Sequence, residues 1–486
     1  MQKISIDPIT RLEGHGRIDI FLNNEGDVAN AYLVIPELRG FEKFAEGRRV
    51  EELIDITPRI CGVCPEAHHM ASTKACDAVW HVDPPPTAKK LRELFYSAFY
   101  VADHMTHFYI LGGPDFVMGP DAPPAERNIL GVIHKVGVET GTKVIQARGK
   151  AMDIIGMLGG RKVHPTFGLP GGVSKAITEE ERQQIEGTAR EEIEFALFTL
   201  QLFRDVVLKN QGYVSLILSD AFTMPTYYMG MVDGDNKVNF YDGKVRVVDP
   251  EGKEFVKYSP NEYLEVVAER VEPWTYLKFP YLKKVGWKGL TTGKESGVYQ
   301  ATPLSRLNAS DGMATPRAQE AHDEMYATLG GKPVHHTLAT HWARLVELLY
   351  AAERLLELAT DPEITNPLVR VVPTEKPDEG VGIVEAPRGT LTHHYVTDER
   401  GIVTKANLIV GTTNNYAPIA IAVRKAAQAV IQKGVVTEGI LNRVEMAFRS
   451  YDPCFGCATH ALPGQMPLEV RVFDAAGNVK EVLKRG

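Results

Sequence analysis

Two Cys-x-x-Cys pairs stand near opposite ends of this chain of 486 residues, Cys61 with Cys64 and Cys454 with Cys457. Thiolates are soft ligands that bind zinc, iron–sulfur clusters or other soft transition metals. We expect the four sulfurs to form one metal site, which requires the fold to bring the two ends of the chain together. The fifth cysteine, Cys76, stands outside the pattern and is expected to be a small buried apolar residue.

A structural zinc site is the simplest alternative for four cysteines in two pairs. Zinc ribbons join their pairs over short connections in order to stabilise a small fold. Several hundred residues separate the pairs here, and a chain of this size needs no such support. Two unrelated buried pairs are another alternative, but they leave the polar residues beside the cysteines unexplained. Because the number of cysteines is odd and no signal peptide is evident, a disulfide framework is not expected.

Composition restricts the partners that the chain can have. Apolar residues make up 44% and charged residues 24% of it, as in an ordinary globular protein. The net charge is −8 and no polybasic stretch occurs, which argues against binding to nucleic acid. No run of about 18 uncharged apolar residues exists, so direct membrane insertion is not expected. The N-terminus lacks the basic and then apolar pattern of a signal peptide, which favours a cytoplasmic protein.

The apolar pattern predicts a mixed α/β (α+β) chain, with long central helices and small sheets near both termini. No internal repeat or flexible linker interrupts it, so one compact body is expected. The period of 3.6 residues that marks amphipathic helices occurs in four segments: 88–111, 178–209, 341–359 and 418–433. Alternation typical of strands occurs in 17–22, 28–35, 382–385, 393–397 and 402–410. Turn residues predict hairpins at 24–26 and 398–401, and 233–257 is expected to be a surface hairpin.

The residues beside the cysteines belong to longer motifs. The first pair lies in RICGVCPEAH (59–68) and the second in DPCFGCATH (452–460). Three more segments are DPITRLEGH (7–15), GRKVHP (160–165) and EAPRG (385–389). Together the five motifs resemble the signatures of nickel–iron hydrogenase large (catalytic) subunits of the soluble, multi-subunit cytoplasmic class. They occur in the family's order, so the resemblance covers the whole chain.

The resemblance implies a nickel–iron centre that cleaves dihydrogen reversibly and heterolytically into protons and electrons. All four thiolates would bind nickel, with Cys61 and Cys454 terminal and Cys64 and Cys457 bridging to iron. The other ligands of the iron would be carbon monoxide and cyanide, which maturation enzymes supply. Thiolate ligands keep nickel electron-rich, and the metals act as Lewis acids and as a template.

The resemblance also implies where the proton goes. The sulfur of Cys454 would act as the base, and Glu13, hydrogen-bonded to it, would be the first proton relay. A carboxyl group buried beside a thiolate should have a raised pKa, which suits proton transfer near neutrality.

In the family an arginine overhangs the metals, and in this chain it is Arg388, which follows Pro387. A guanidinium is normally held to be permanently protonated, so we expect it to stabilise and orient charge. Buried there, it needs a carboxylate partner. Asp115, in HFYILGGPD (107–115), matches the family's aspartate for this purpose, and Asp452 is expected to lie nearby.

Residues around the metal ligands are assigned by the same resemblance. His68 would hydrogen-bond a bridging cysteine, and Thr412 would donate a hydrogen bond to cyanide. Glu42, His460 and the carbonyl of Leu408 would bind a structural magnesium ion, for which such mixed ligands are chemically acceptable. Five further histidines, all in adjacent pairs, are expected to be structural: His69, His335, His336, His393 and His394.

The resemblance implies several partners. No cysteines remain for a chain of iron–sulfur clusters, so electrons would leave through an iron–sulfur small subunit. Further subunits of the diaphorase, ferredoxin-linked or heterodisulfide-linked kind are expected beyond it. A maturation endopeptidase would cut between His460 and Ala461, so 1–460 would be the catalytic domain and 461–486 a removed peptide. Within that peptide, 468–473 and a turn at 475–478 predict a hairpin.

Three other functions remain open from the sequence. A dihydrogen sensor would keep the metals but turn over slowly. A metal-free electron-transfer relative of the complex I quinone-site subunit would lack the four cysteines, which are present here. A zinc-stabilised binding protein would contain zinc alone.

Overall fold

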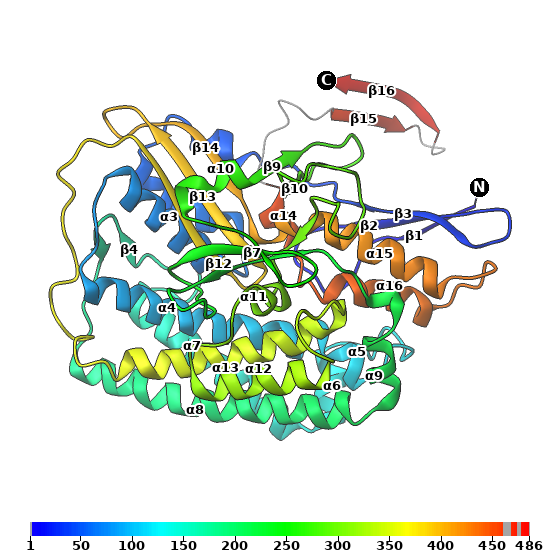
Figure 1. Cartoon of the computed structure of the whole chain (residues 1–486), viewed down its shortest axis with the longest axis horizontal. Helices are drawn as coiled ribbons and strands as arrows, with labels where there is room; N and C mark the ends of the chain where they lie inside the picture. The colour runs from blue at the N-terminus through cyan, green and yellow to red at the C-terminus, as the bar shows by residue number, and fades with distance from the viewer. Residues whose placement is uncertain (1, 460–467, 474–477, 486) are drawn as a thin grey trace.

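Four long helices form the lower layer of the molecule in Figure 1: α4 (Pro86–Thr106), α7 (Val138–Gly159), α8 (Glu179–Phe203) and α13 (Thr340–Ala359). The computed structural model describes residues 2–459, 468–473 and 478–485. α13 packs against both α8 and α4, and α4 packs against α7. The mixed α/β fold with long central helices in one body is confirmed.

The helix predictions are confirmed in place, with two differences at their ends. α8 begins at the predicted capping box of Thr178 and Glu181. α4 and α8 do not run as far as predicted, because each passes into a π-helical turn, η3 (His107–Gly112) and η4 (Arg204–Leu208). The fourth predicted helix is α15 (Tyr416–Val430). Helices α3 (Pro65–Val79) and α7 were not predicted.

Helix α3 lies directly on the central antiparallel sheet of β12 (Glu379–Ala386), β13 (Gly389–Thr397) and β14 (Val403–Ile409). The contact depends on glycine. A Cβ atom at Gly382 would lie 2.2 Å from the carbonyl oxygen of Ala71 and 2.4 Å from the amide nitrogen of Ala75. Because α3 begins beside Cys64, this contact sets the depth of the first cysteine pair.

The two ends of the chain meet beside the N-terminal sheet, whose strands are β1 (Gln2–Ile6), β2 (Arg17–Leu22) and β3 (Val28–Val34). α15 packs against β3, and α16 (Glu438–Arg449) packs against α15. An isolated parallel bridge joins Glu13 to Cys454, and the amide of Phe455 donates to the carbonyl oxygen of Glu13 at 3.0 Å. The predicted approach of the two ends is therefore confirmed.

The predicted surface hairpin at 233–257 is part of a larger sheet. Its strands β7 (Lys244–Val248) and β8 (Glu254–Tyr258) pair with β6 (Tyr227–Val232), which pairs in parallel with β11 (Tyr299–Gln300). Val245 and Val247 are fully buried, so one face of the hairpin is core. Smaller elements complete the chain: α1 Phe41–Ala45, α2 Leu53–Ile56, α5 Pro114–Val117, α6 Ile129–Val136, α9 Gln211–Ile217, α10 Tyr263–Val266, α11 Pro303–Ala309, α12 Pro316–Thr328, α14 Gly411–Asn414, α17 Phe455–Ala458, β4 Gly168–Leu169, β5 Gly172–Val173, β9 Val267–Arg270 and β10 Phe279–Leu282.

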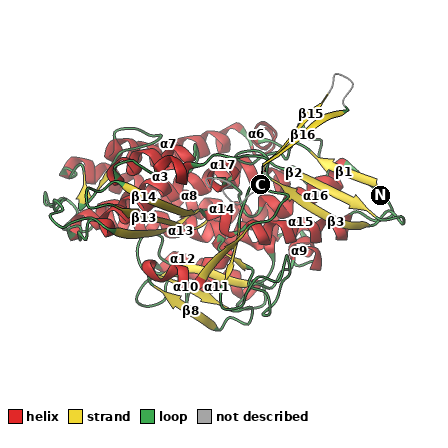
Figure 2. Cartoon of the chain, turned by 90° about the horizontal axis from the view of Figure 1, so that it is seen from above, coloured by secondary structure: helices red, strands yellow, loops and turns green. Residues whose placement is uncertain are grey.

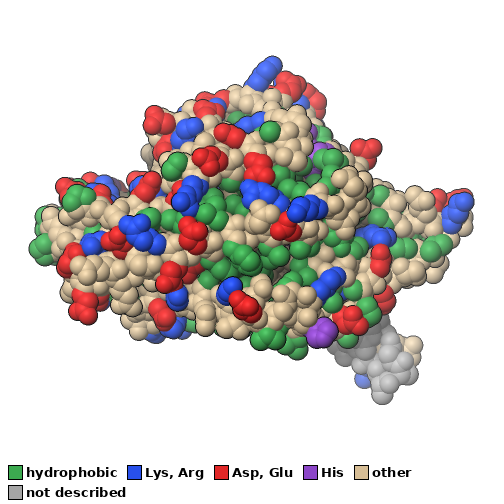
Figure 3. Space-filling model, turned by 90° about the horizontal axis from the view of Figure 1, so that it is seen from below, with side chains coloured by type: hydrophobic (Ala, Val, Ile, Leu, Met, Phe, Trp, Pro, Cys, Tyr) green, Lys and Arg blue, Asp and Glu red, His purple; other side chains and the backbone are tan. Residues whose placement is uncertain are grey.

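The last described strands, β15 (Leu468–Phe473) and β16 (Val479–Arg485), form a separate antiparallel pair, which Figure 2 shows extending from the body. The predicted pairing is present, whereas most of its predicted turn lies outside the described residues. Figure 3 shows apolar side chains gathered across the middle of the lower face, among charged groups. Among the described helices, none combines the length and the apolar character needed to cross a membrane.

The glycine contact can be tested by adding a single methyl group. Gly382→Ala should lower the free energy of unfolding by about 1–3 kcal/mol, because α3 must move away from β12. Gly187→Ala, at an open position within α8, should instead raise it by about 0.5–1 kcal/mol. Urea unfolding of both variants measures the effect. An unchanged midpoint for Gly382→Ala would show that the contact tolerates a side chain.

Candidate metal centre

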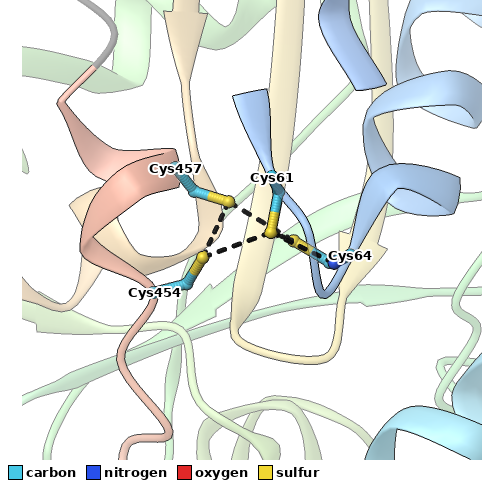
Figure 4. Close-up of side chains that lie close together, drawn as sticks. All are labelled: Cys61, Cys64, Cys454 and Cys457. Carbon is cyan, nitrogen blue, oxygen red and sulfur yellow. Dashed lines mark hydrogen bonds between the residues drawn. The ribbon is translucent and has the colours of Figure 1, made fainter. Parts of the chain in front are cut away.

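Four thiol groups from the two ends of the chain meet at one buried point, shown in Figure 4. The sulfur of Cys61 lies 3.0 Å from that of Cys64 and 3.3 Å from that of Cys454. The sulfur of Cys457 lies 2.8 Å from that of Cys454 and 3.4 Å from that of Cys64. All four sulfurs lie within 4.8 Å of one another. The prediction that both pairs form one site is confirmed, and we call this set the sulfur cluster.

Local backbone geometry directs these sulfurs inward. Cys61 follows the 3-10 turn η2 (Thr57–Ile60), and the amides of Val63 and Cys64 donate to its sulfur at 3.2 and 3.1 Å. Pro65 then begins α3, where its missing N–H costs nothing. At the second pair, the amide of Cys454 donates to the hydroxyl of Thr412 at 2.9 Å. Both loops therefore hold their sulfurs through main-chain bonds.

Burial makes the sulfur cluster a site for a cation. Desolvation raises the pKa of the Cys454 and Cys457 thiols well above their usual value. For Cys61, hydrogen bonds from the other three thiols outweigh the opposing effect of burial, so its pKa falls well below the usual value. Several thiolates cannot share such a buried site without positive charge, which a soft metal ion supplies while replacing the protons.

Glu13 lies against the sulfur cluster, as predicted. The thiol of Cys454 donates to its Oε2 atom at 2.8 Å, and the amide of Gly456 donates to the same atom at 2.9 Å. Burial raises the pKa of Glu13, and the negative charge of Cys61 adds to the effect. The direction of this shift agrees with the prediction.

Arg388 also lies near the cysteines, but its predicted partner is wrong. Its Nη1 atom donates to Asp103 at 3.0 Å and its Nη2 atom lies 2.9 Å from Asp452, so only the prediction for Asp452 is confirmed. Asp115 instead binds Arg11 and Arg449. The physical reason is that the chain turns after η3, which carries Asp115 onto α5 and toward α16, whereas Asp103 stays on α4.

The two carboxylates keep Arg388 charged. Although burial opposes the charge, Asp103 and Asp452 raise the pKa of Arg388 above its usual value. Burial raises the pKa of Asp452 to about 7, against the opposing effect of Arg388. All three side chains are almost fully buried. A fixed positive charge held between carboxylates can stabilise developing negative charge nearby.

The sequence did not predict three residues that fix this region. His393 bonds Nδ1 of His68 at 3.1 Å through its own Nε2 atom. Arg306 donates to the carbonyl of Pro387 at 3.1 Å, and it is held by Glu347. Asp103 is the third. A charged residue on the buried face of α4, among aromatic residues, was the available signal for Asp103.

The remaining predicted residues lie as follows. The amide of Leu408 donates to Oε1 of Glu42 at 2.8 Å, so these two proposed magnesium ligands are adjacent. Burial raises the pKa of Glu42. His460 lies outside the described residues. Cys76 is buried and its thiol contacts the carbonyl of Val50, as expected of a small buried residue. The structural assignment of His69 agrees with its buried bonds to Ile54 and two backbone amides.

Known proteins resemble this chain over almost its whole length. A family profile described as nickel-dependent hydrogenase matches residues 39–128 and 122–460, and a profile described as HoxL-like matches 3–38. An F420-non-reducing hydrogenase subunit of Archaeoglobus profundus, named for iron–sulfur, is 52% identical over 485 residues, covering 100% of both chains. The NAD-reducing hydrogenase HoxS subunit beta of Cupriavidus necator is 39% identical, covering 98% of each. A solved NAD+-reducing [NiFe]-hydrogenase in the H2-reduced state has a TM-score of 0.89 and 36% identity, covering 95% of this chain and 100% of its own.

The sulfur cluster can be tested in metal-free protein with cadmium, a soft ion that thiolates prefer. The chain should bind one equivalent of Cd²⁺, and Cys61→Ser or Cys457→Ser should weaken binding at least about tenfold. Cys76→Ser is the matched control and should bind as tightly as the unmodified chain, because Cys76 lies outside the cluster. Calorimetric titration measures the affinities. Equal affinity of all the variants would contradict a shared site.

Proposed function

Because the chain belongs to the nickel-dependent hydrogenase family, we propose that the groups around its sulfur cluster divide the heterolytic cleavage of dihydrogen between them. The chain is the catalytic component of a hydrogenase, which interconverts dihydrogen with protons and electrons at a nickel–iron centre. The observation that carries the proposal is the carboxyl group of Glu13. It accepts a hydrogen bond from the thiol of Cys454 at the edge of four buried sulfurs.

The donor set fits the metals of the family. Four soft sulfur atoms, buried and close together, suit nickel and iron better than hard cations. We assign Cys61 and Cys454 to nickel alone, and Cys64 and Cys457 to nickel and iron together. Carbon monoxide and cyanide would complete the iron, and Thr412 would donate to cyanide. When bound, the metals supply Lewis-acid polarisation and a template for dihydrogen.

The proton would leave through Cys454 and Glu13. The Cys454 sulfur takes the proton and passes it across the 2.8 Å hydrogen bond to the Glu13 carboxyl. Glu13 is partly exposed and stands two residues before the exposed His15, so it connects the buried sulfur with the surface side of the site. The amide of Gly456 keeps the carboxyl oriented toward the sulfur.

Arg388 would stabilise and orient charge over the cluster without itself giving up a proton. Asp103 and Asp452 hold its planar guanidinium from two sides, which fixes its direction. Pro387 leads the backbone into this position, and Arg306 holds the Pro387 carbonyl. His68 would support a bridging cysteine, and His393 would fix the His68 ring.

Relatives named as components of multi-subunit hydrogenases indicate that this chain also works with small-subunit partners. We propose that the direct electron acceptor is an iron–sulfur small subunit. A diaphorase, or a ferredoxin- or heterodisulfide-linked component, would follow in a cytoplasmic complex. Leu130, Val138 and Ile145 on α6 and α7 are each about two-thirds or more exposed, which is favourable for contact with a partner. We further propose a structural magnesium ion on Glu42, the Leu408 carbonyl and His460.

Glu13→Gln tests the proton route. The variant should keep its nickel and iron, but hydrogen–deuterium exchange between dihydrogen and solvent should fall by about 10²–10⁴-fold, because an amide cannot relay the proton. Interconversion of ortho and para dihydrogen needs no solvent proton and should continue. Glu192→Gln, at a buried carboxyl on α8, is the control and should change neither rate. Normal solvent exchange in Glu13→Gln would remove Glu13 from the route.

The C-terminal peptide gives a second test. We propose that 1–460 is the mature domain and that an endopeptidase removes 461–486 after metal insertion. In support, β15 and β16 pair with each other and join no other sheet, so their removal breaks no sheet among the described residues. The intact mass of the nickel-loaded, active chain should correspond to a polypeptide that ends at His460, while metal-free protein should retain the whole chain. An active enzyme that keeps residues 461–486 would contradict processing.

A further inference from the structure

A second buried group of charges lies beside the sulfur cluster and has no part in the proposed chemistry. At its centre is Asp115 on α5, whose Oδ1 atom accepts from Arg11 at 2.5 Å. Nη1 of Arg449 lies 3.0 and 2.8 Å from the two Asp115 oxygens, and Asn442 donates to Oδ1 at 3.2 Å. Asp115 and Arg449 are each 1% exposed. We call Asp115, Arg11 and Arg449 the Asp115 triad.

The triad joins the two segments that carry the proposed proton-transfer groups. Arg11 stands two residues before Glu13, and Arg449 stands five residues before Cys454. Nε of Arg449 also donates to the carbonyl of Thr10 at 3.3 Å. The bridge between the N-terminal segment and the end of α16 therefore contains both main-chain and side-chain bonds.

Each arginine is held firmly on its own segment. Arg11 has a φ of 57°, a left-handed conformation that a residue with a side chain rarely adopts, and its Nη1 atom donates to the carbonyl of Leu111 at 2.8 Å. Arg449 is paired on its other side with Glu445, which also accepts from the amide of Thr10 at 3.2 Å. A shift of either arginine therefore moves its backbone.

The contact that depends on this bridge is close. A Cβ atom at Gly456 would lie 2.5 Å from Oε1 of Glu13, and one at Gly14 would lie 2.7 Å from the amide nitrogen of Gly456. The Glu13 carboxyl thus reaches Cys454 only while the two backbones stay in contact. Arg11 and Arg449 carry like charges that repel each other, and Asp115 compensates both.

We propose that Asp115, acting through Arg11 and Arg449, is a positioning residue that holds the Glu13 carboxyl against the Cys454 sulfur for proton transfer. The proposal rests on the relay role of Glu13 proposed above. Without the Asp115 charge, two buried guanidinium groups face each other uncompensated, and the segments before Glu13 and Cys454 separate. This role differs from a direct pairing of Asp115 with Arg388, which the structure excludes.

A first experiment uses full-length, metal-free protein. The amides of Phe455 and Gly456 donate to Glu13, so their hydrogen exchange reports the contact directly. In Asp115→Asn these two amides should exchange at least about tenfold faster than in the unmodified chain. Asp77→Asn is the matched control, because Asp77 forms a comparable buried pair with Arg92 near the far end of α3. It should leave both amides unchanged.

A second experiment uses the metal-loaded enzyme. Asp115→Asn should retain nickel and ortho–para interconversion but lose solvent hydrogen–deuterium exchange, as Glu13→Gln does. Asp77→Asn should keep both reactions. If Asp115→Asn does not fold, Arg11→Lys, which keeps the charge but not the planar fork, should shift both measurements in the same direction by a smaller factor.

The outcomes separate this inference from the relay itself. If Glu13→Gln keeps solvent exchange, the relay fails, while the amide measurement still decides whether the Asp115 triad holds the contact. Unchanged amide exchange in Asp115→Asn overturns the inference. Equal losses of both reactions in Asp115→Asn and Asp77→Asn also overturn it, since they show a general effect on stability.

Discussion

The contact between the N-terminal segment at Glu13 and the loop of the second cysteine pair is the constraint on which the rest of the site depends. A β-bridge, the Phe455 amide and the Glu13 side chain all join the same two stretches of backbone. The first pair is positioned independently, by the glycine-dependent seat of α3 on β12. The sulfur cluster forms only where these two arrangements coincide, so long-range packing, and not the motifs alone, determines the geometry of the ligands.

Charge compensation gives the interior a second level of order. Arg388 lies between Asp103 and Asp452, and Arg306 lies between Glu347 and Glu385, with every one of these groups buried. A buried charge without a partner is costly, so each pair restricts its members to one arrangement. The fixed dipoles that result surround the sulfur cluster and do not need to reorganise when charge changes there.

The motifs predicted the ligands correctly because Cys-x-x-Cys spacing sets local geometry whatever the fold. The partner of Arg388 could not be predicted in the same way. Asp103 and Asp115 are both near histidine and aromatic residues, and the π-helical turn η3 between them changes the helical phase. Long amphipathic helices such as α8 and α13 were predictable from their period, whereas α7 lies largely at the surface with a weak pattern. The pairing of His68 with His393 joins residues 325 positions apart, and no local signal specifies it.

The distance along the chain between the two cysteine pairs has a consequence for biosynthesis. Cys61 and Cys454 are 393 positions apart, yet their sulfurs are neighbours. At about 5–20 residues per second, the ribosome makes the second pair roughly 20–80 s after the first. Throughout that interval a nascent chain holds two thiols that have no companions and cannot enclose a metal ion. Assembly of the centre is therefore confined to the period after translation, and the half-made site must be shielded from oxidation and from unsuitable metals until then.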